Sequence, residues 1–206
     1  RGAGGKAFAA GTDISQFRDF TTPDQALAYE ATIDRVLSDL ERCPVPTIAA
    51  ITGACTGGGA AIAAACDIRL SDQRLRYGFP IARTLGNCLS IASLARLSTL
   101  LGAARLREIL LTARLIEAEE ALRIGLVSEV LEGAEAVEDR AAELAEQLAE
   151  HAPLSIRATK EGLRRLRQDG VGAKADDLVT SCYMSADFKQ GIEAFLGKRK
   201  PKWTGR

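Results

Sequence analysis

The sequence contains a single histidine, His151, among its 206 residues. His151 stands at the end of a predicted helix, where a cationic ring would stabilise the helix dipole. No histidine then remains for a Ser-His-Asp or Cys-His catalytic site, and a metal site built on imidazole is disfavoured.

The cysteines show no pairing pattern. There are five of them, an odd number, and none forms a C-x-x-C pair. This spacing excludes a disulfide framework and a zinc site, and it predicts free thiols in a reducing compartment, the cytoplasm by default.

Neither a net charge nor a long apolar run is present. Lys and Arg number 27, as do Asp and Glu, so no overall field attracts nucleic acid or an anionic membrane. No apolar run approaches the roughly 20 residues of a membrane helix. A hydrophobic content of 47% predicts one globular domain with a sizeable core and a long helical end. Residues 1–5 are glycine-rich and resemble a loop, not a natural start.

The stretch from Pro46 to Asp67 organises the rest of the chain. Thr47–Ile51 is a short apolar run typical of a strand covered on both faces. Three glycines follow, and Ala60–Ala65 is then a segment with very small side chains. Glycines between a strand and a helix either permit close packing or present free backbone N–H groups to a negative charge. The segment lacks the Lys-Ser/Thr of a phosphate loop and the spaced glycines of a dinucleotide fold.

The periodicity of apolar residues and the positions of proline and glycine predict the remaining elements. Residues 16–24 read as a mobile polar loop. Strands are expected at 8–10, 68–71, 75–79 and 126–130, and helices at 23–42, 89–101, 104–111, 117–124, 134–151, 153–169 and 174–186.

Two motifs together carry a family resemblance. Lys6–Ile14 reads KAFAAGTDI, and Pro46–Gly59 reads PTIAAITGACTGGG. They resemble the K-x-F-x-A-G-x-D-[IL] and P-x-[IV]-A-x-[IV]-x-G-x-x-x-G-G-G motifs of the crotonase (enoyl-CoA hydratase/isomerase) superfamily. GLVSEV at 125–130 and GIEAFLGKRKPKW at 191–203 match later landmarks of that family, so the likeness extends over nearly the whole chain.

The resemblance implies an α/β fold, a crotonase-like ββα spiral core with a helical C-terminal trimerisation region. Residues 1–132 would form the core, with its N-terminal part missing, and residues 133–206 the helical region. It also implies an acyl-CoA thioester substrate, with coenzyme A entering as part of the substrate and no permanently bound cofactor. A homotrimer or a dimer of trimers is expected, with no nucleic-acid or membrane partner.

By resemblance, two backbone N–H groups hold the thioester oxygen, and the matching residues are Thr12 and Gly58. Two donors aimed at one oxygen stabilise an enolate or a tetrahedral anion. Ala10, Asp13 and Ile14 flank Thr12 in the motif and are expected at the substrate site. Asp13 has a second interpretation, since a short Asp after a turn caps the next helix.

Both glutamates that the family uses for hydration are absent. One lies two residues after the glycine triplet and the other just after a proline; the matching residues are Ala61 and Ile81. Neither side chain can transfer a proton, so plain hydration of an enoyl thioester is doubtful. Both residues are instead expected to line the acyl site.

The segment IARTLGNCLS offers other groups. Gly86-Asn87-Cys88 is similar to the Gly-Asn-Asp of the chlorobenzoyl-CoA dehalogenase branch, with Cys88 at the position of the nucleophilic Asp. A helix starting near Asn87 would favour the Cys88 thiolate and hence hydrolytic or dehalogenase-like chemistry. Alternatively, Cys88 is a small buried residue at a helix start. Arg83 is either a ligand for a carboxylate on the acyl group or a surface charge.

The C-terminal landmark implies contacts with coenzyme A. By resemblance, Phe195 and Lys198 reach the coenzyme A of a neighbouring subunit, whereas a basic tail by itself is more typical of a solvated end. A third interpretation of the whole chain is a non-catalytic acyl-CoA-binding subunit.

Overall fold

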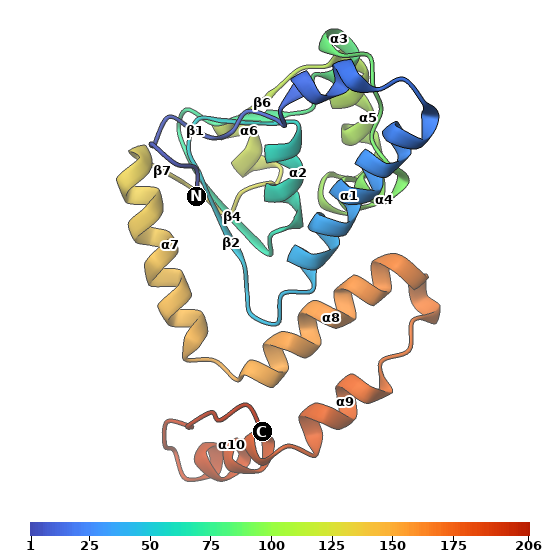
Figure 1. The fold of residues 1–206 in the computed structure, drawn as a ribbon. Helices are drawn as coiled ribbons and strands as arrows, with labels where there is room; N and C mark the ends of the chain where they lie inside the picture. The colour runs from blue at the N-terminus through green and yellow to red at the C-terminus, as the bar shows by residue number, and fades with distance from the viewer. The chain divides into compact units, whose positions relative to one another are not determined.

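Strands and helices alternate through the first two thirds of the computed structural model, which describes all 206 residues (Figure 1). Contacts divide the chain into two units, Arg1–Glu41 with Thr47–Ala142, and Arg42–Pro46 with Glu143–Arg206. The first unit contains the elements β1 (Ala7–Ala9), η1 (Ile14–Asp19), α1 (Pro23–Glu41), β2 (Ile48–Ile51), β3 (Ala54–Thr56), α2 (Gly58–Ala65), β4 (Ile68–Asp72), β5 (Arg76–Gly78), α3 (Ile81–Thr84), α4 (Ile91–Leu101), α5 (Ala103–Thr112), β6 (Ile116–Glu117), α6 (Ala118–Arg123), β7 (Glu129–Leu131) and the start of α7 (Gly133–Ala149).

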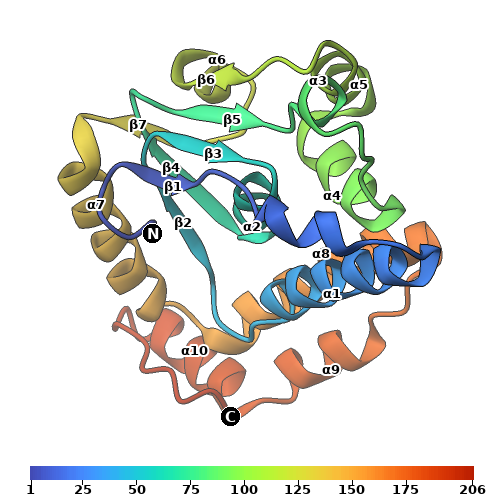
Figure 2. The same cartoon turned by 45° about the horizontal axis from the view of Figure 1, so that its top comes forward.

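Successive strands of the first unit are distributed over two sheets (Figure 2). One sheet has the order β1-β3-β5-β6, in which only the β5–β6 pair is antiparallel, and the other has the all-parallel order β2-β4-β7. The pair β2 and β3 precedes α2, and the pair β4 and β5 precedes α3, so each repeat gives one strand to each sheet. The predicted ββα spiral is confirmed.

Helix α2 is surrounded by the other elements of the first unit. It packs against α1 and α4 and against strands β1 and β3. Its residues GGAAIAAA carry so little side chain that backbones approach it closely, and five of the eight are buried. The surrounding core is filled by larger buried side chains, including Leu37, Ile51, Leu75, Tyr77, Leu97, Ile109, Ile116 and Leu126.

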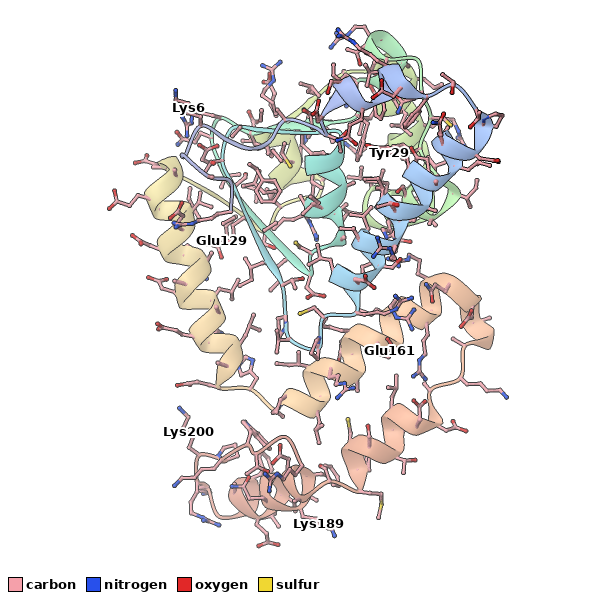
Figure 3. The ribbon with its side chains drawn as sticks, viewed as in Figure 1. Lys6, Tyr29, Glu129, Glu161, Lys189 and Lys200 are labelled. Atoms are coloured by element: carbon pink, nitrogen blue, oxygen red, sulfur yellow. The ribbon has the colours of Figure 1, made fainter.

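The first part of α7 covers the sheet β2-β4-β7. Val137 is fully buried with Ala50 and Leu70, and partly buried apolar residues pack around them. Arg140 of α7 donates to the carboxylate of Glu129 at the start of β7, and Figure 3 labels this glutamate. The sheet is therefore apolar on the α7 face as well as on the core face.

The second unit is helical. Besides the end of α7, its elements are α8 (Pro153–Asp169), η2 (Gly170–Gly172), α9 (Asp176–Tyr183) and α10 (Ala186–Leu196). The Asp187 carboxylate accepts hydrogen bonds from the backbone N–H groups of Thr204 and Gly205, and the Trp203 ring lies against Gly191. The C-terminal residues thus fold back along α10.

Several elements differ from the sequence prediction. Residues 14–19 form a 3₁₀ helix where a loop was predicted, because the Asp13 carboxylate caps them by accepting from the Ser15 N–H at 2.9 Å. Strand β7 lies at Glu129–Leu131 instead of 126–130, since a turn occupies the preceding residues. The short elements β3, β6 and α3 and the helix α10 were not predicted.

None of the helices combines the length and the apolar composition needed to cross a bilayer.

Candidate active site

The loop after β1 meets the N-terminal end of α2. A β-carbon built on Gly58 would lie 2.8 Å from Thr12 Cγ2 and 3.6 Å from the Thr12 backbone nitrogen. Gly58 is the first residue of α2, so its N–H has no acceptor within the helix. The Thr12 N–H donates to no other backbone group. The two predicted backbone donors, which are 46 residues apart in the sequence, are therefore neighbours in the structure.

Side-chain hydrogen bonds hold the Thr12 loop from two directions. Tyr29 of α1, labelled in Figure 3, donates its hydroxyl to Thr12 Oγ1 at 2.9 Å. Thr56, at the end of β3, donates its hydroxyl to the Ala10 carbonyl at 2.9 Å. The Tyr29 ring also packs edge-on against Phe17 of η1, with ring centroids 5.1 Å apart. The loop is thereby tied to α1 and to β3.

Helix α2 is fixed near its N-terminal end. The Gly57 N–H donates to the Gly78 carbonyl at 3.0 Å, with Gly57 at a φ of 55° that favours glycine. The buried Tyr77 hydroxyl donates to the Ala60 carbonyl at 3.1 Å, and burial raises the pKa of this phenol, so it stays a donor. A β-carbon on Gly59 would lie 2.3 Å from the Ala9 carbonyl oxygen, so only glycine allows this approach to β1.

Arg69 fixes the C-terminal end of the same helix. Its guanidinium donates to the carbonyls of Cys66 at 2.6 Å, Ala63 at 3.3 Å and Leu126 at 2.8 Å. A cation here satisfies carbonyls that have no intrahelical donor and is stabilised by the helix dipole.

A cavity of about 300 Å³ opens beside Thr12 and Gly58. Its walls are mainly apolar, and Ala61 and Ile81 both line it. The further lining residues are Ala10, Gly11, Ile14, Phe17, Tyr29, Glu30, Ile33, Thr56, Gly57, Phe79, Pro80, Thr84, Leu85, Asn87, Cys88, Leu89 and Ser93.

Glu30 of α1 is the one carboxylate among the lining residues, and the sequence interpretation missed it. Burial raises the pKa of the Glu30 carboxyl, and the charge of Asp34 raises it further. The signal that reveals Glu30 is helical spacing: Ile33 and Leu37 follow at i+3 and i+7, which puts Glu30 on the apolar stripe of α1.

Cys88 and Asn87 line the cavity, but not at a helix start. Helix α4 begins at Ile91, and Ser90 caps it by accepting from the Ser93 N–H. The helix predicted at 89–101 thus begins two residues later, at Ile91, and the helix start near Asn87 on which the thiolate interpretation depended is not found. Cys88 is exposed, so the interpretation of a buried packing residue is also wrong.

Asp13 and Arg83 do not line the cavity. The Asp13 carboxylate accepts hydrogen bonds from the Ser15 hydroxyl at 2.7 Å and from its N–H, and these bonds lower the Asp13 pKa. The capping interpretation of Asp13 is confirmed. Arg83 is an exposed residue of the short helix α3.

Phe195 and Lys198 belong to the second unit. Phe195 of α10 is 84% exposed, and Lys198 follows that helix at a φ of 50° with its N–H donating to the Phe195 carbonyl. Phe195 therefore has little contact with the rest of its own chain.

Comparisons with known proteins agree with this architecture. The model of the family described as enoyl-CoA hydratase/isomerase matches residues 1–206. A short-chain-enoyl-CoA hydratase of Clostridium acetobutylicum is 35% identical over 202 residues, which cover 97% of this chain and 76% of that protein. A crotonyl-CoA hydratase of Syntrophomonas wolfei is 31% identical, with 100% of this chain and 79% of that protein covered.

Solved structures show the same likeness. The crystal structure of an enoyl-CoA hydratase/carnithine racemase from Magnetospirillum magneticum superposes with a TM-score of 0.87 at 36% identity, covering 99% of this chain and 76% of that one. An enoyl-CoA hydratase from Bacillus anthracis gives a TM-score of 0.86 at 31% identity, covering 99% and 79%. Over its entire described length, the chain belongs to the enoyl-CoA hydratase/isomerase family of enzymes.

Proposed function

We propose that the chain binds an acyl-CoA thioester with its carbonyl oxygen between the N–H groups of Thr12 and Gly58. The observation that supports this proposal is the closeness of the two residues beside an apolar cavity: a β-carbon built on Gly58 would lie 3.6 Å from the Thr12 backbone nitrogen. Coenzyme A is part of the substrate in this proposal, and the relatives named as enoyl-CoA hydratases agree with that substrate class.

The two amides stabilise negative charge that develops on the carbonyl oxygen. Each such donor contributes roughly 3–4 kcal/mol to lowering the barrier when it is already oriented. The hydrogen bonds to Thr12 and Ala10 and the fixation of α2 supply that orientation. The apolar walls receive an apolar acyl group and exclude water, which strengthens the interaction with the oxyanion.

Hydration of crotonyl-CoA is slow in this proposal. Water addition needs proton transfer at two positions, and the side chains at 61 and 81 are a methyl group and a branched alkyl group. Ala61 and Ile81 both line the cavity, and neither supplies a carboxylate there.

The test is a panel of acyl-CoAs assayed for binding by calorimetry and for product by mass spectrometry. Wild-type protein is expected to bind and convert at least one acyl-CoA. The variant Gly58→Ala, whose methyl group would meet Thr12 Cγ2 at 2.8 Å, is expected to lose about 10²–10³-fold in kcat. Absence of binding overturns the proposal, and tight binding without turnover leaves a non-catalytic acyl-CoA-binding subunit instead.

A second candidate is hydrolysis through Cys88, favoured by the exposed Cys88 thiol on the cavity wall. The thiolate would attack the thioester carbonyl, coenzyme A would leave as a thiol, and water would then release the acid from the acyl-cysteine. Unchanged activity of Cys88→Ala removes this candidate.

Assembly as a homotrimer or a dimer of trimers, with Phe195 and Lys198 at the coenzyme A of a neighbouring subunit, belongs to the same proposal. The 84% exposure of Phe195 supports it. Sedimentation of the intact chain tests the assembly, and Lys198→Ala is expected to weaken binding of acyl-CoA without changing its conversion when bound.

A further inference from the structure

The cavity has one acidic side chain, and it comes from an unexpected wall. Glu30 lies on α1, immediately after Tyr29, whose hydroxyl donates to Thr12. Two consecutive residues of α1 therefore serve the site: Tyr29 holds the Thr12 loop by a hydrogen bond, and Glu30 places a carboxylate on the cavity wall. The positions at which the family resemblance leads one to look for carboxylates, Ala61 and Ile81, lie on α2 and α3.

Glu30 differs from the next carboxylate on the same face of α1. Asp34, one turn later, accepts a hydrogen bond from Ser90 at 2.8 Å and pairs with Arg96 of α4 at 3.4 Å. Glu30 has no hydrogen-bond or ion-pair partner, and the charge that acts on it is the repulsive one of Asp34. An unpaired, partly buried carboxylate is unfavourable for folding, so its presence calls for a role other than packing.

We propose that Glu30 is the catalytic residue that moves a proton of the acyl group bound at Thr12 and Gly58. This inference rests on the proposed thioester site. The Glu30 carboxylate takes a proton from the α-carbon: the C–H bond breaks, an O–H bond forms on Glu30, and the electron pair moves to the carbonyl oxygen. The resulting enolate is the anion that the two N–H groups stabilise.

A single carboxylate fits a proton shift better than a hydration. With a β,γ-unsaturated acyl-CoA, Glu30 returns the same proton to the γ-carbon, the carbonyl re-forms, and the double bond moves into conjugation with it. No water and no second acid are needed. The reaction class assigned to this cavity is therefore the isomerisation of a β,γ-enoyl thioester.

The electrostatic surroundings suit a base of this kind. Besides Glu30, the titratable groups on the cavity wall are Tyr29 and Cys88, and Asp34, one turn later on α1, pairs with Arg96. Burial and the Asp34 charge raise the pKa of Glu30, which makes its carboxylate a stronger base than an exposed one.

The experiment uses the full chain and two readouts. Conversion of vinylacetyl-CoA to crotonyl-CoA is followed by absorbance, and incorporation of deuterium at the α-carbon of butyryl-CoA in heavy water by mass spectrometry. The variants are Glu30→Gln, Glu30→Asp and the control Glu119→Gln, which makes the same chemical change at an exposed position of α6. Binding of butyryl-CoA is measured for each variant by calorimetry.

Glu30→Gln is expected to bind butyryl-CoA as the wild type does, while both proton-transfer rates fall about 100-fold or more. Glu30→Asp regains part of the rate, and Glu119→Gln keeps it all. The wild-type rate rises with pH as Glu30 loses its proton, and this rise is absent in Glu30→Gln.

Equal rates for Glu30→Gln and wild type overturn the role of Glu30 while leaving the thioester site intact. Binding of butyryl-CoA without any exchange by the wild type also overturns the role of Glu30 alone. Failure of the wild type to bind butyryl-CoA or any other acyl-CoA overturns the thioester site and the role of Glu30 together.

Discussion

Replacing Gly59 by alanine tests the close approach of α2 to β1 without reference to any substrate. The added β-carbon would lie 2.3 Å from the Ala9 carbonyl oxygen and 2.6 Å from the Ala9 β-carbon. Both opposing atoms belong to the backbone or are attached directly to it, so no side-chain rotation relieves the overlap. Helix α2 must move away from β1 by about 1 Å, the difference between these distances and ordinary van der Waals contact.

Two opposing contributions set the magnitude. Overpacking a buried site destabilises by about 1–3 kcal/mol, and a backbone obstacle belongs at the upper end of that range. Alanine is favoured over glycine in a helix by about 1 kcal/mol, which offsets part of the loss. The free energy of unfolding of Gly59→Ala should fall by about 2 kcal/mol. The melting temperature should fall by about 4–8 °C, since each kcal/mol corresponds to roughly 2–4 °C at this chain length.

Circular dichroism during heating and in urea measures both quantities. Gly162→Ala is the matched control, because a β-carbon there meets only Leu178 Cδ1 at 3.8 Å inside α8. The control should gain about 1 kcal/mol from helix propensity alone. If Gly59→Ala melts at or above the wild-type temperature, the packing of α2 against β1 described above is incorrect.

Three further predictions concern other hydrogen bonds. Tyr29→Phe loses the hydrogen bond to Thr12 Oγ1, so the free energy of unfolding should fall by about 1 kcal/mol and kcat should change more than KM. Steady-state kinetics with an acyl-CoA that the wild type converts measures both constants, and an unchanged kcat contradicts the prediction. Arg69→Met leaves helix carbonyls without a donor and should lower the free energy of unfolding by about 3 kcal/mol in urea titrations. A hydrogen bond from Arg164 lowers the pKa of Glu161, labelled in Figure 3, from 4.5 to about 2. Glu161 therefore contributes stability above pH 4.5 that is lost as the pH falls toward 2, and Glu161→Gln should flatten this part of the acid-unfolding curve.

The fold could be predicted where local chemistry determines the backbone. Strand β2 and helix α2 lie at nearly the predicted bounds, because the apolar run at 47–51, the three glycines and the alanine segment determine them. Pro23 and Pro153 are the first residues of α1 and α8, as predicted. Strands β3 and β6 have three and two residues, too few to show an alternating pattern, and they exist because neighbouring strands pair with them. Helix α10 has a cap that is visible in the sequence, Ser185, whose hydroxyl accepts from the Phe188 N–H.

The candidate site could be predicted in part. The motif positions placed Thr12 and Gly58, and the structure brings these residues together. Glu30 was missed because it belongs to no motif, and a carboxylate on a helix face shows its importance only when the opposite walls are known to be apolar. The prediction of a helix from residue 89 overlooked Ser90, which caps α4 by accepting from the Ser93 N–H and so places its start at Ile91.

The composition of α2 has a consequence for how such a protein can change its chemistry. Seven of its eight residues are glycine or alanine, and close packing against α1, α4, β1 and β3 requires small residues on the faces that meet these elements. Ala61 differs, because its side chain faces the cavity, where a larger group has room. New reactive groups are therefore expected at the cavity wall, on Ala61 or on the long helix α1, while the packed faces of α2 keep their small residues.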